Sequence, residues 1–387
     1  MDILLITALP VYPRHSRDAM LVAYLARELA ARRHVLDLLS FYHHPEELAE
    51  QPRYRHYFRS VKLVRDVPRR LKERHLERAQ RFPQEESAAW SREMWQAVLG
   101  CVQDAHYDVV QLVGGVEVYE YWHLMQGLPT VIIPSARHFH YLTPPAQARH
   151  LPGEDEPFRA SENWMFAPFD RVLITTPQEG ALMSKMDALA RQRRIPLGVD
   201  TDYFTPTGYD PIVPGLLFSG DFALQADLEA ALLLCEEVLP RVQATLPETR
   251  LYLLGRNAPP HLLEHASERV IIAQNIIDPR PYFERASVYL CPLTSYGGFR
   301  LDILQALAMQ TPVIASDESL AGLDIHSGQE VLVRRFAEDF AETAVDLIRD
   351  EELRRRLKTY GQACLKNQYL WERVADLYET LYLDLIG

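Results

Sequence analysis

Residues Ile277–Val333 carry the clearest structural pattern in the chain and read IDPRPYFERASVYLCPLTSYGGFRLDILQALAMQTPVIASDESLAGLDIHSGQEVLV. Within them, Val288–Cys291 form a short apolar run that is typical of a buried strand. A loop with Gly297–Gly298 follows, a helix is expected over about Leu301–Met309, and a second apolar strand is expected over Pro312–Ala315. The pattern therefore predicts a strand–loop–helix–strand unit whose loop leads directly into a helix N-terminus.

A loop of this kind is suited to bind a phosphate group. The first turn of a helix leaves backbone N–H groups unpaired and carries the positive end of the helix dipole. Glycine at position 298 lets the backbone come close to a ligand, and Arg300 adds a planar set of donors that matches phosphate oxygens. Alone, these residues also fit a plain turn followed by a solvated arginine.

The same stretch resembles the nucleotide-binding half of GT-B glycosyltransferases, in particular the GT4-like group of bacterial sugar transferases. In that group a Gly-rich loop, an Arg, a Lys and Leu-Glu-Ala precede a helix and a Pro-Val-Val strand. Residues Gly298–Ala306 and Thr311–Ile314 lie on this pattern. The resemblance spans the chain, more closely after Pro196, through these further segments: Pro196–Phe204, Leu217–Gly220, Leu251–Gly255, Ile277–Tyr282 and Gln368–Tyr378.

The resemblance implies an α/β protein of GT-B architecture, with two Rossmann-like doubly wound domains that face a central cleft. The implied domains are an acceptor-side domain at 1–195, a nucleotide-sugar domain at 196–365, and a C-terminal helix at 366–387 that crosses back to the first domain. Strand and helix patterns alternate in both halves, which independently favours parallel sheets. The expected strands are Ile3–Thr7, Val35–Leu39, Val109–Leu112, Val131–Ile133, Val172–Thr175, Leu216–Ser219, Arg250–Leu254, Val270–Ala273, Val288–Cys291, Pro312–Ala315 and Val331–Val333.

As an activity, the resemblance implies retaining transfer of a sugar from a nucleotide-sugar to a cell-surface polysaccharide, glycolipid or related acceptor. Such an enzyme needs no metal or other cofactor, because hydrogen-bond donors and helix dipoles stabilise the leaving nucleoside diphosphate. It implies donor contacts at Gly220, Asp221, Gly298, Phe299, Arg300, Leu301 and Gln305. It implies catalytic roles for His138, Asp18 and Arg300, and acceptor-side roles for Arg14, Arg17 and His140.

The chain departs from the family pattern at several of these positions. Asp302 stands where the family has Lys, Gln305 where it has Glu, and Arg17 where it has Gly. A carboxylate in place of an ammonium group turns the attraction to a diphosphate into a repulsion. Each pair of unit charges interacts with about 4 kcal/mol at ~4 Å and an effective dielectric near 20, so the sign of the charge matters. Two interpretations stay open: an enzyme with an altered cleft, or a catalytically inactive pseudo-glycosyltransferase that acts as a binding or partner subunit of an active glycosyltransferase.

The bulk composition of the 387 residues narrows the class further. A net charge of −12 argues against a nucleic-acid-binding protein. The four cysteines have no CxxC spacing and the histidines no zinc-type spacing, so we expect reduced thiols, no metal and a cytoplasmic protein without a signal peptide. No run of ~20 apolar residues predicts a membrane span.

One basic segment interrupts the acidic sequence. Residues 53–81 are dense in Arg and Lys, with Tyr54, Tyr57 and Phe58 interleaved. The segment fits a solvated helical surface. It also fits peripheral contact with anionic lipid headgroups at the inner face of the membrane, or with a lipid-linked acceptor.

Overall fold

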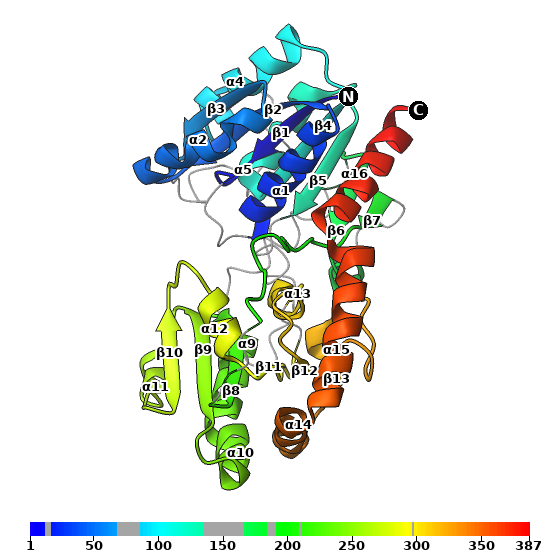
Figure 1. Cartoon of the computed structure of the whole chain (residues 1–387). Helices are drawn as coiled ribbons and strands as arrows, with labels where there is room; N and C mark the ends of the chain where they lie inside the picture. The colour runs from blue at the N-terminus through cyan, green and yellow to red at the C-terminus, as the bar shows by residue number, and fades with distance from the viewer. Residues whose placement is uncertain are drawn as a thin grey trace. The chain divides into compact units, whose positions relative to one another are not determined.

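The computed structural model describes residues 1–11, 17–67, 86–134, 166, 168–183, 191–208, 211, 213–295 and 298–387. These residues form two compact units (Figure 1). The first comprises residues 1–195 together with 374–387, and the second comprises residues 196–373.

The first unit contains a seven-stranded sheet in the order β3-β2-β1-β4-β5-β6-β7, and all its pairs are parallel. The strands are β1 Asp2–Thr7, β2 Val35–Tyr42, β3 Ser60–Arg65, β4 Val109–Gly114, β5 Thr130–Pro134, β6 Arg171–Ile174 and β7 Gln192–Arg194. The central strands are buried almost throughout, which is why they read as continuous apolar runs rather than as alternating ones.

Helices join the strands of this sheet. They are α1 Arg17–Ala31, α2 Gln51–Tyr54, α4 Arg92–Asp104, α5 Val116–Tyr119 and α8 Pro177–Met183. Helix α1 buries Leu21, Val22, Leu25 and Leu29, whose spacing of three and four residues forms a single apolar face. Short 3₁₀ turns complete the connections at Pro45–Glu50, Arg55–Tyr57, Glu86–Ala88 and Trp122–Met125.

The last helix, α16, spans Trp371–Ile386, and its residues from Val374 onward belong to the first unit. Glu379 anchors it there, since its carboxylate lies 2.9 Å from Nη1 of Arg32 and 2.9 Å from Nε2 of His34. The buried hydroxyl of Tyr382 adds a hydrogen bond to Gln111 on β4.

The second unit contains a six-stranded parallel sheet in the order β10-β9-β8-β11-β12-β13. Its strands are β8 Gly215–Asp221, β9 Arg250–Arg256, β10 Val270–Gln274, β11 Val288–Cys291, β12 Val313–Ala315 and β13 Leu332–Val333. Its helices are α9 Gln225–Leu233, α10 Leu239–Thr245, α11 Pro260–Leu263, α12 Arg280–Arg285, α13 Leu301–Ala308, α14 Ala337–Arg349 and α15 Glu351–Cys364. A 3₁₀ turn spans Glu318–Leu320, and π-helical turns span Leu234–Val238 and Leu365–Tyr369.

The prediction of two Rossmann-like parallel sheets is confirmed, and the central cleft expected between them stays a prediction. The helical interpretation of the basic segment is wrong for Ser60–Arg65, which form the edge strand β3. This strand is half exposed and carries Lys62 and Arg65, so it lacks the apolar run that marks the other strands. The last helix, expected from about Trp371 within the C-terminal segment 366–387, begins at Trp371 after a π-helical turn.

No helix among the described residues is long and apolar enough to cross a membrane. The rest of the basic segment, residues 68–81, lies outside the described residues.

Close backbone contact between β8 and β9 depends on glycine. A Cβ added to Gly255 would lie 2.1 Å from the carbonyl oxygen of Gly220, which is a backbone atom that cannot rotate away. A Cβ added to Gly100 in α4, by contrast, would meet nothing within 4 Å.

These two glycines form a matched pair for substitution. We expect Gly255→Ala to lower the free energy of unfolding by about 1–3 kcal/mol, because the added methyl group forces the two strands apart. Gly100→Ala should raise it by roughly 0.5–1 kcal/mol, because alanine loses less backbone entropy in a helix. Urea denaturation of both variants measures the two changes, and equal changes would contradict this account of the β8–β9 contact.

Candidate functional site

The site expected from the sequence lies at the carboxyl edge of the second sheet. Strand β11 ends there at Cys291, and the chain returns to begin α13 at Leu301. Gly298 lies in this loop with φ +83°, a left-handed conformation that favours glycine, and a Cβ added to it would meet open space. Within the described part of the chain, the N–H groups of Gly298 and Phe299 donate no hydrogen bond. The loop therefore presents two free backbone donors next to a helix N-terminus.

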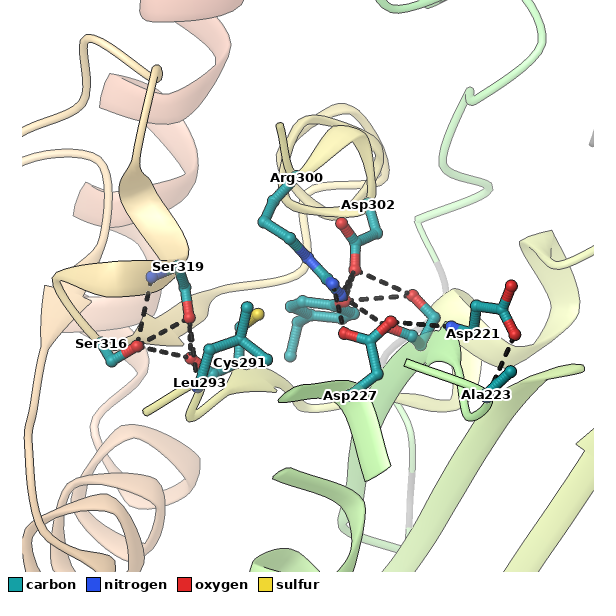
Figure 2. A network of polar contacts seen from close by, with 11 residues as sticks. Asp221, Ala223, Asp227, Cys291, Leu293, Arg300, Asp302, Ser316 and Ser319 are labelled. Carbon is teal, nitrogen blue, oxygen red and sulfur yellow. Dashed lines mark hydrogen bonds and ion pairs between the residues drawn. The ribbon is translucent and has the colours of Figure 1, made fainter. Parts of the chain in front are cut away.

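Arg300 occupies the N-cap position of α13 but points into the protein rather than away from it (Figure 2). Its side chain is only 6% exposed. Nη1 lies 2.6 Å from Oδ1 of Asp227, and Nη2 donates to the carbonyl oxygen of Ser219 at 2.7 Å and also to Asp302. The guanidinium thus binds two carboxylates and one carbonyl of its own chain.

Asp302 is bound from three sides. Its Oδ2 accepts hydrogen bonds from Arg300, from the hydroxyl of Tyr289 on β11, and from the hydroxyl of Ser219 on β8 at 3.3 Å. Residues from two strands and from α13 therefore meet at a single carboxylate oxygen. The anion at the position where the resemblance implies Lys is paired internally with Arg300.

The buried cluster of Arg300, Asp227 and Asp302 holds one cation and two carboxylates. Burial raises the pKa of Asp227, and the charge of Arg300 opposes that rise. Burial works against the charge of Arg300 itself, but Asp227 and Asp302 outweigh it and raise the pKa of the guanidinium. The two carboxylates therefore keep Arg300 charged.

Gly220 is predicted to let the sugar donor approach the backbone. In the structure the side chain next to it is that of Asp227. A Cβ at this position would lie 2.7 Å from the carboxylate of Asp227, so the side chain of Asp227 fills the space that the glycine leaves. Asp227 is 3% exposed, and its Oδ2 also accepts the N–H of Asp221 at 2.8 Å. In this structure the missing side chain at position 220 accommodates the ion-pair cluster.

Asp221 closes the end of β8. Its carboxylate accepts Nε of Arg256 at 2.9 Å, Nδ2 of Asn257 at 2.7 Å and the N–H of Ala223 at 3.2 Å. Burial opposes ionisation of Asp221, but these three donors outweigh it and lower its pKa. A predicted donor contact is thus an ionised carboxylate that fixes the loop between β8 and α9.

A serine pair, which the sequence reasoning missed, fixes the ends of β11 and β12. The hydroxyl of Ser319 donates to the carbonyl oxygen of Cys291 at 2.6 Å and lies 2.7 Å from the hydroxyl of Ser316 (Figure 2). The N–H of Ser319 donates to Ser316 at 3.2 Å, and the N–H of Leu293 donates to Ser319 at 3.3 Å. The signal in the sequence is a serine directly after a strand with a second serine three residues later, a spacing typical of local turn hydrogen bonds.

Of the other residues predicted for this edge, Leu301 and Gln305 both lie on α13. The side chain of Gln305 is half-buried and makes no hydrogen bond within the described part of the chain. It is free to pair with a ligand.

In the first unit, Arg17 and Asp18 begin α1. Nε of Arg17 lies 3.1 Å from Oδ1 of Asp18, Nη1 lies 3.3 Å from the buried Glu179, and Nη2 donates to the carbonyl oxygen of Pro134 at 3.0 Å. Arg17 therefore ties the start of α1 to the end of β5 and to α8. Arg14, His138 and His140 lie outside the described residues.

No cluster of three His, Cys, Asp or Glu side chains that could hold a metal ion occurs among the described residues. Metal independence stays a prediction.

The ion-pair cluster makes a direct stability prediction. Arg300→Met leaves the buried Asp227 and the partly buried Asp302 without their cation, so we expect the free energy of unfolding at pH 7 to fall by about 3–5 kcal/mol. Urea denaturation measures this loss. Adding Asp227→Asn and Asp302→Asn should recover part of it, because the stranded charges are then removed.

Arg256→Met is the matched control. Its ion pair with Asp221 has a similar distance, 2.9 Å, but its side chain is 54% exposed. We expect a loss below about 1 kcal/mol there. Equal losses at Arg300 and Arg256 would contradict a structural role for the buried cluster.

Comparisons with known proteins agree with the fold. Residues 213–350 match the family model described as glycosyl transferases group 1. The GDP-mannose:cellobiosyl-diphosphopolyprenol alpha-mannosyltransferase of Xanthomonas campestris is 25% identical over 315 residues, which cover 75% of this chain and 77% of that protein.

Among the solved structures that match, two are similar to this chain over its whole length. The sucrose-phosphate synthase of Thermosynechococcus elongatus has a TM-score of 0.73 at 20% identity. The match covers 100% of this chain and 99% of the synthase chain. Anabaena HepE, solved with UDP and glucose, has a TM-score of 0.70 at 11% identity, with 100% of both chains covered.

Proposed function

We propose that this chain, which has the GT-B fold and a group 1 glycosyltransferase domain at residues 213–350, transfers a sugar from a nucleotide-sugar to a glycan or lipid-linked acceptor. The predicted family resemblance and fold class are confirmed by the comparisons. The observation that carries the proposal is the loop before α13, where the N–H groups of Gly298 and Phe299 have no acceptor among the described residues. Free donors at a helix N-terminus are an anion site that needs no cationic side chain.

In this proposal the diphosphate of the donor binds to backbone N–H groups. Arg300 does not bind the diphosphate but holds these groups in position. Arg300 holds the first turn of α13 against β8 through Ser219 and against α9 through Asp227. Fixed backbone donors stabilise a developing negative charge because they need no reorganisation during the reaction. The same donors would let the leaving diphosphate depart without a metal, and the proposal includes a retaining, metal-independent transfer.

Gln305 lies one helical turn after the loop and is proposed to bind the ribose of the nucleotide. Its amide can accept one hydrogen bond and donate another, whereas the Glu expected from the family pattern can only accept. A carboxamide therefore still recognises a pair of hydroxyl groups.

The acceptor side of the proposal is supported by the mannosyltransferase relative, whose name includes a diphosphopolyprenol-linked sugar. A lipid-linked acceptor is presented at a membrane surface, where a basic protein surface would meet anionic headgroups. Lys62 and Arg65 are exposed on the edge strand β3 and have no ion-pair partner among the described residues. Peripheral contact through this edge is part of the proposal.

A second candidate function is favoured by the charge of the cluster behind the loop. Asp227 and Asp302 together outweigh Arg300 by one formal charge when both are ionised. A net negative cluster beside the expected diphosphate disfavours donor binding. The chain would then be an inactive glycosyltransferase homologue that binds a glycan or a partner glycosyltransferase. Failure to transfer or hydrolyse sugar from any common UDP-, GDP- or ADP-sugar would favour this second function.

Calorimetric titration with UDP, GDP and ADP tests the donor site. We expect one of these nucleotides to bind, and Gln305→Ala to weaken its binding by about tenfold, since the loss of one or two ribose hydrogen bonds is worth roughly 1–1.5 kcal/mol. Gln96→Ala, an exposed glutamine of the first unit, serves as the control and should leave binding unchanged. If none of the three nucleotides binds, the proposed donor site is wrong.

Asp302→Asn tests the electrostatic argument separately. Asparagine keeps a hydrogen-bond acceptor for Arg300 and Tyr289 but removes one negative charge beside the loop. We expect the nucleoside diphosphate to bind at least several-fold tighter, with a weaker effect at high salt. Binding of the corresponding uncharged nucleoside should not change, and weaker diphosphate binding would contradict the placement of the anion at α13.

A further inference from the structure

A histidine–carboxylate pair lies at the carboxyl edge of the sheet in the first unit. His43 directly follows β2, and Asp66 directly follows the neighbouring strand β3. The last residues of the two strands, Tyr42 and Arg65, are register partners, so the next residue of each strand is brought to the same place. Ligands of open α/β sheets bind outside this edge.

Asp66 is held in place by hydrogen bonds other than its contact with His43. Its N–H donates to the carbonyl oxygen of Tyr42 at 2.8 Å, and Oδ1 accepts the indole N–H of Trp90 at 2.6 Å. Its side chain is 9% exposed, and Oδ2 lies 3.3 Å from Nδ1 of His43. A buried carboxylate that is held by a second donor fixes the orientation and the tautomer of a histidine ring.

The other ring nitrogen of His43 is available. The ring is 32% exposed, and Nε2 has no hydrogen-bond partner among the residues that the structure describes. The backbone N–H of His43 donates to Oε2 of Glu47 at 2.7 Å, which holds the main chain in place. With Nδ1 directed to Asp66, Nε2 is the atom that can meet a ligand.

The charges around His43 select the class of ligand. The hydrogen bond to Asp66 raises the pKa of the imidazole, burial opposes the rise, and Glu47 and Glu117 add to it. Asp66, Glu47 and Glu117 are three carboxylates around a single imidazole. Their combined charge repels a phosphate or carboxylate ligand, whereas a neutral hydroxyl group pairs with a histidine and with carboxylates equally well.

We propose that His43, oriented by Asp66, binds a hydroxyl group of a neutral sugar and forms the acceptor-sugar subsite of the first unit. This inference rests on the proposed glycosyltransferase function, and it adds the acceptor chemistry that the site recognises. His43 contacts the substrate, and Asp66 is a positioning residue that acts through it. Of the acceptor-side residues expected from the sequence, Arg17 contacts Asp18, Glu179 and Pro134 instead, and Arg14 and His140 lie outside the described residues.

The test is an NMR titration of the histidine ring signals of the full-length protein, with His43 assigned from His43→Gln. The probes are the methyl glycosides of glucose, mannose and galactose, and inorganic phosphate. We expect at least one methyl glycoside to shift the His43 signal saturably, and phosphate to leave it unchanged. His265 is the internal control, because its ring is 31% exposed and lies 3.3 Å from Glu236 in the second unit. Its signal should not move.

Asp66→Asn separates a positioning role from a merely structural one. We expect the pKa of His43 to fall and the glycoside affinity to drop at least fivefold, while nucleotide binding to the second unit is unchanged. In a transfer assay, His43→Gln should raise the acceptor KM at constant donor KM.

The proposal of an acceptor subsite at His43 is overturned if no methyl glycoside shifts the His43 ring signal. It is also overturned if phosphate shifts this signal and competes with the glycoside. Failure of nucleotide binding would instead overturn the donor site, so the two proposals fail separately.

Discussion

The second unit depends on one buried interaction, the ion pairing of Arg300 with Asp227 and Asp302. It joins residues from α9 and α13 and reaches the backbone of β8 through the carbonyl oxygen of Ser219. Buried charges are tolerated only where geometry and further hydrogen bonds compensate for lost hydration. Here Tyr289 and the N–H of Asp221 supply those bonds, and Gly220 supplies the space. The position of the loop before α13 follows from this cluster.

The cluster also changes the meaning of the family resemblance. A cation that would face a diphosphate faces inward instead, and the anion at position 302 is its partner rather than an isolated departure from the pattern. The departure at position 302 is thus part of a paired cluster, in which two carboxylates share one guanidinium. Within the described part of this loop, the groups left for an anion are the backbone N–H groups of Gly298 and Phe299, which form a preorganised site.

Much of the fold could be predicted from the sequence because buried parallel strands leave apolar runs, and Val288–Cys291 matches its prediction residue for residue. Edge strand β3 could not be predicted this way, since half of its side chains meet water and two of them are basic. The site was predictable where it depends on neighbours in sequence, as in the loop and N-terminus of α13. It was not predictable where partners are distant: Arg300 and Asp227 are 73 residues apart, and no spacing rule reports their contact.

The most direct test of this account is a crystal structure of the protein with the nucleoside diphosphate that binds most tightly. The account predicts phosphate oxygens on the N–H groups of Gly298 and Phe299, with the guanidinium of Arg300 still bound to Asp227 and Asp302. A structure in which Arg300 has left both carboxylates and contacts the phosphates would contradict it, because the buried cluster would then be a resting arrangement rather than the constraint that shapes the site.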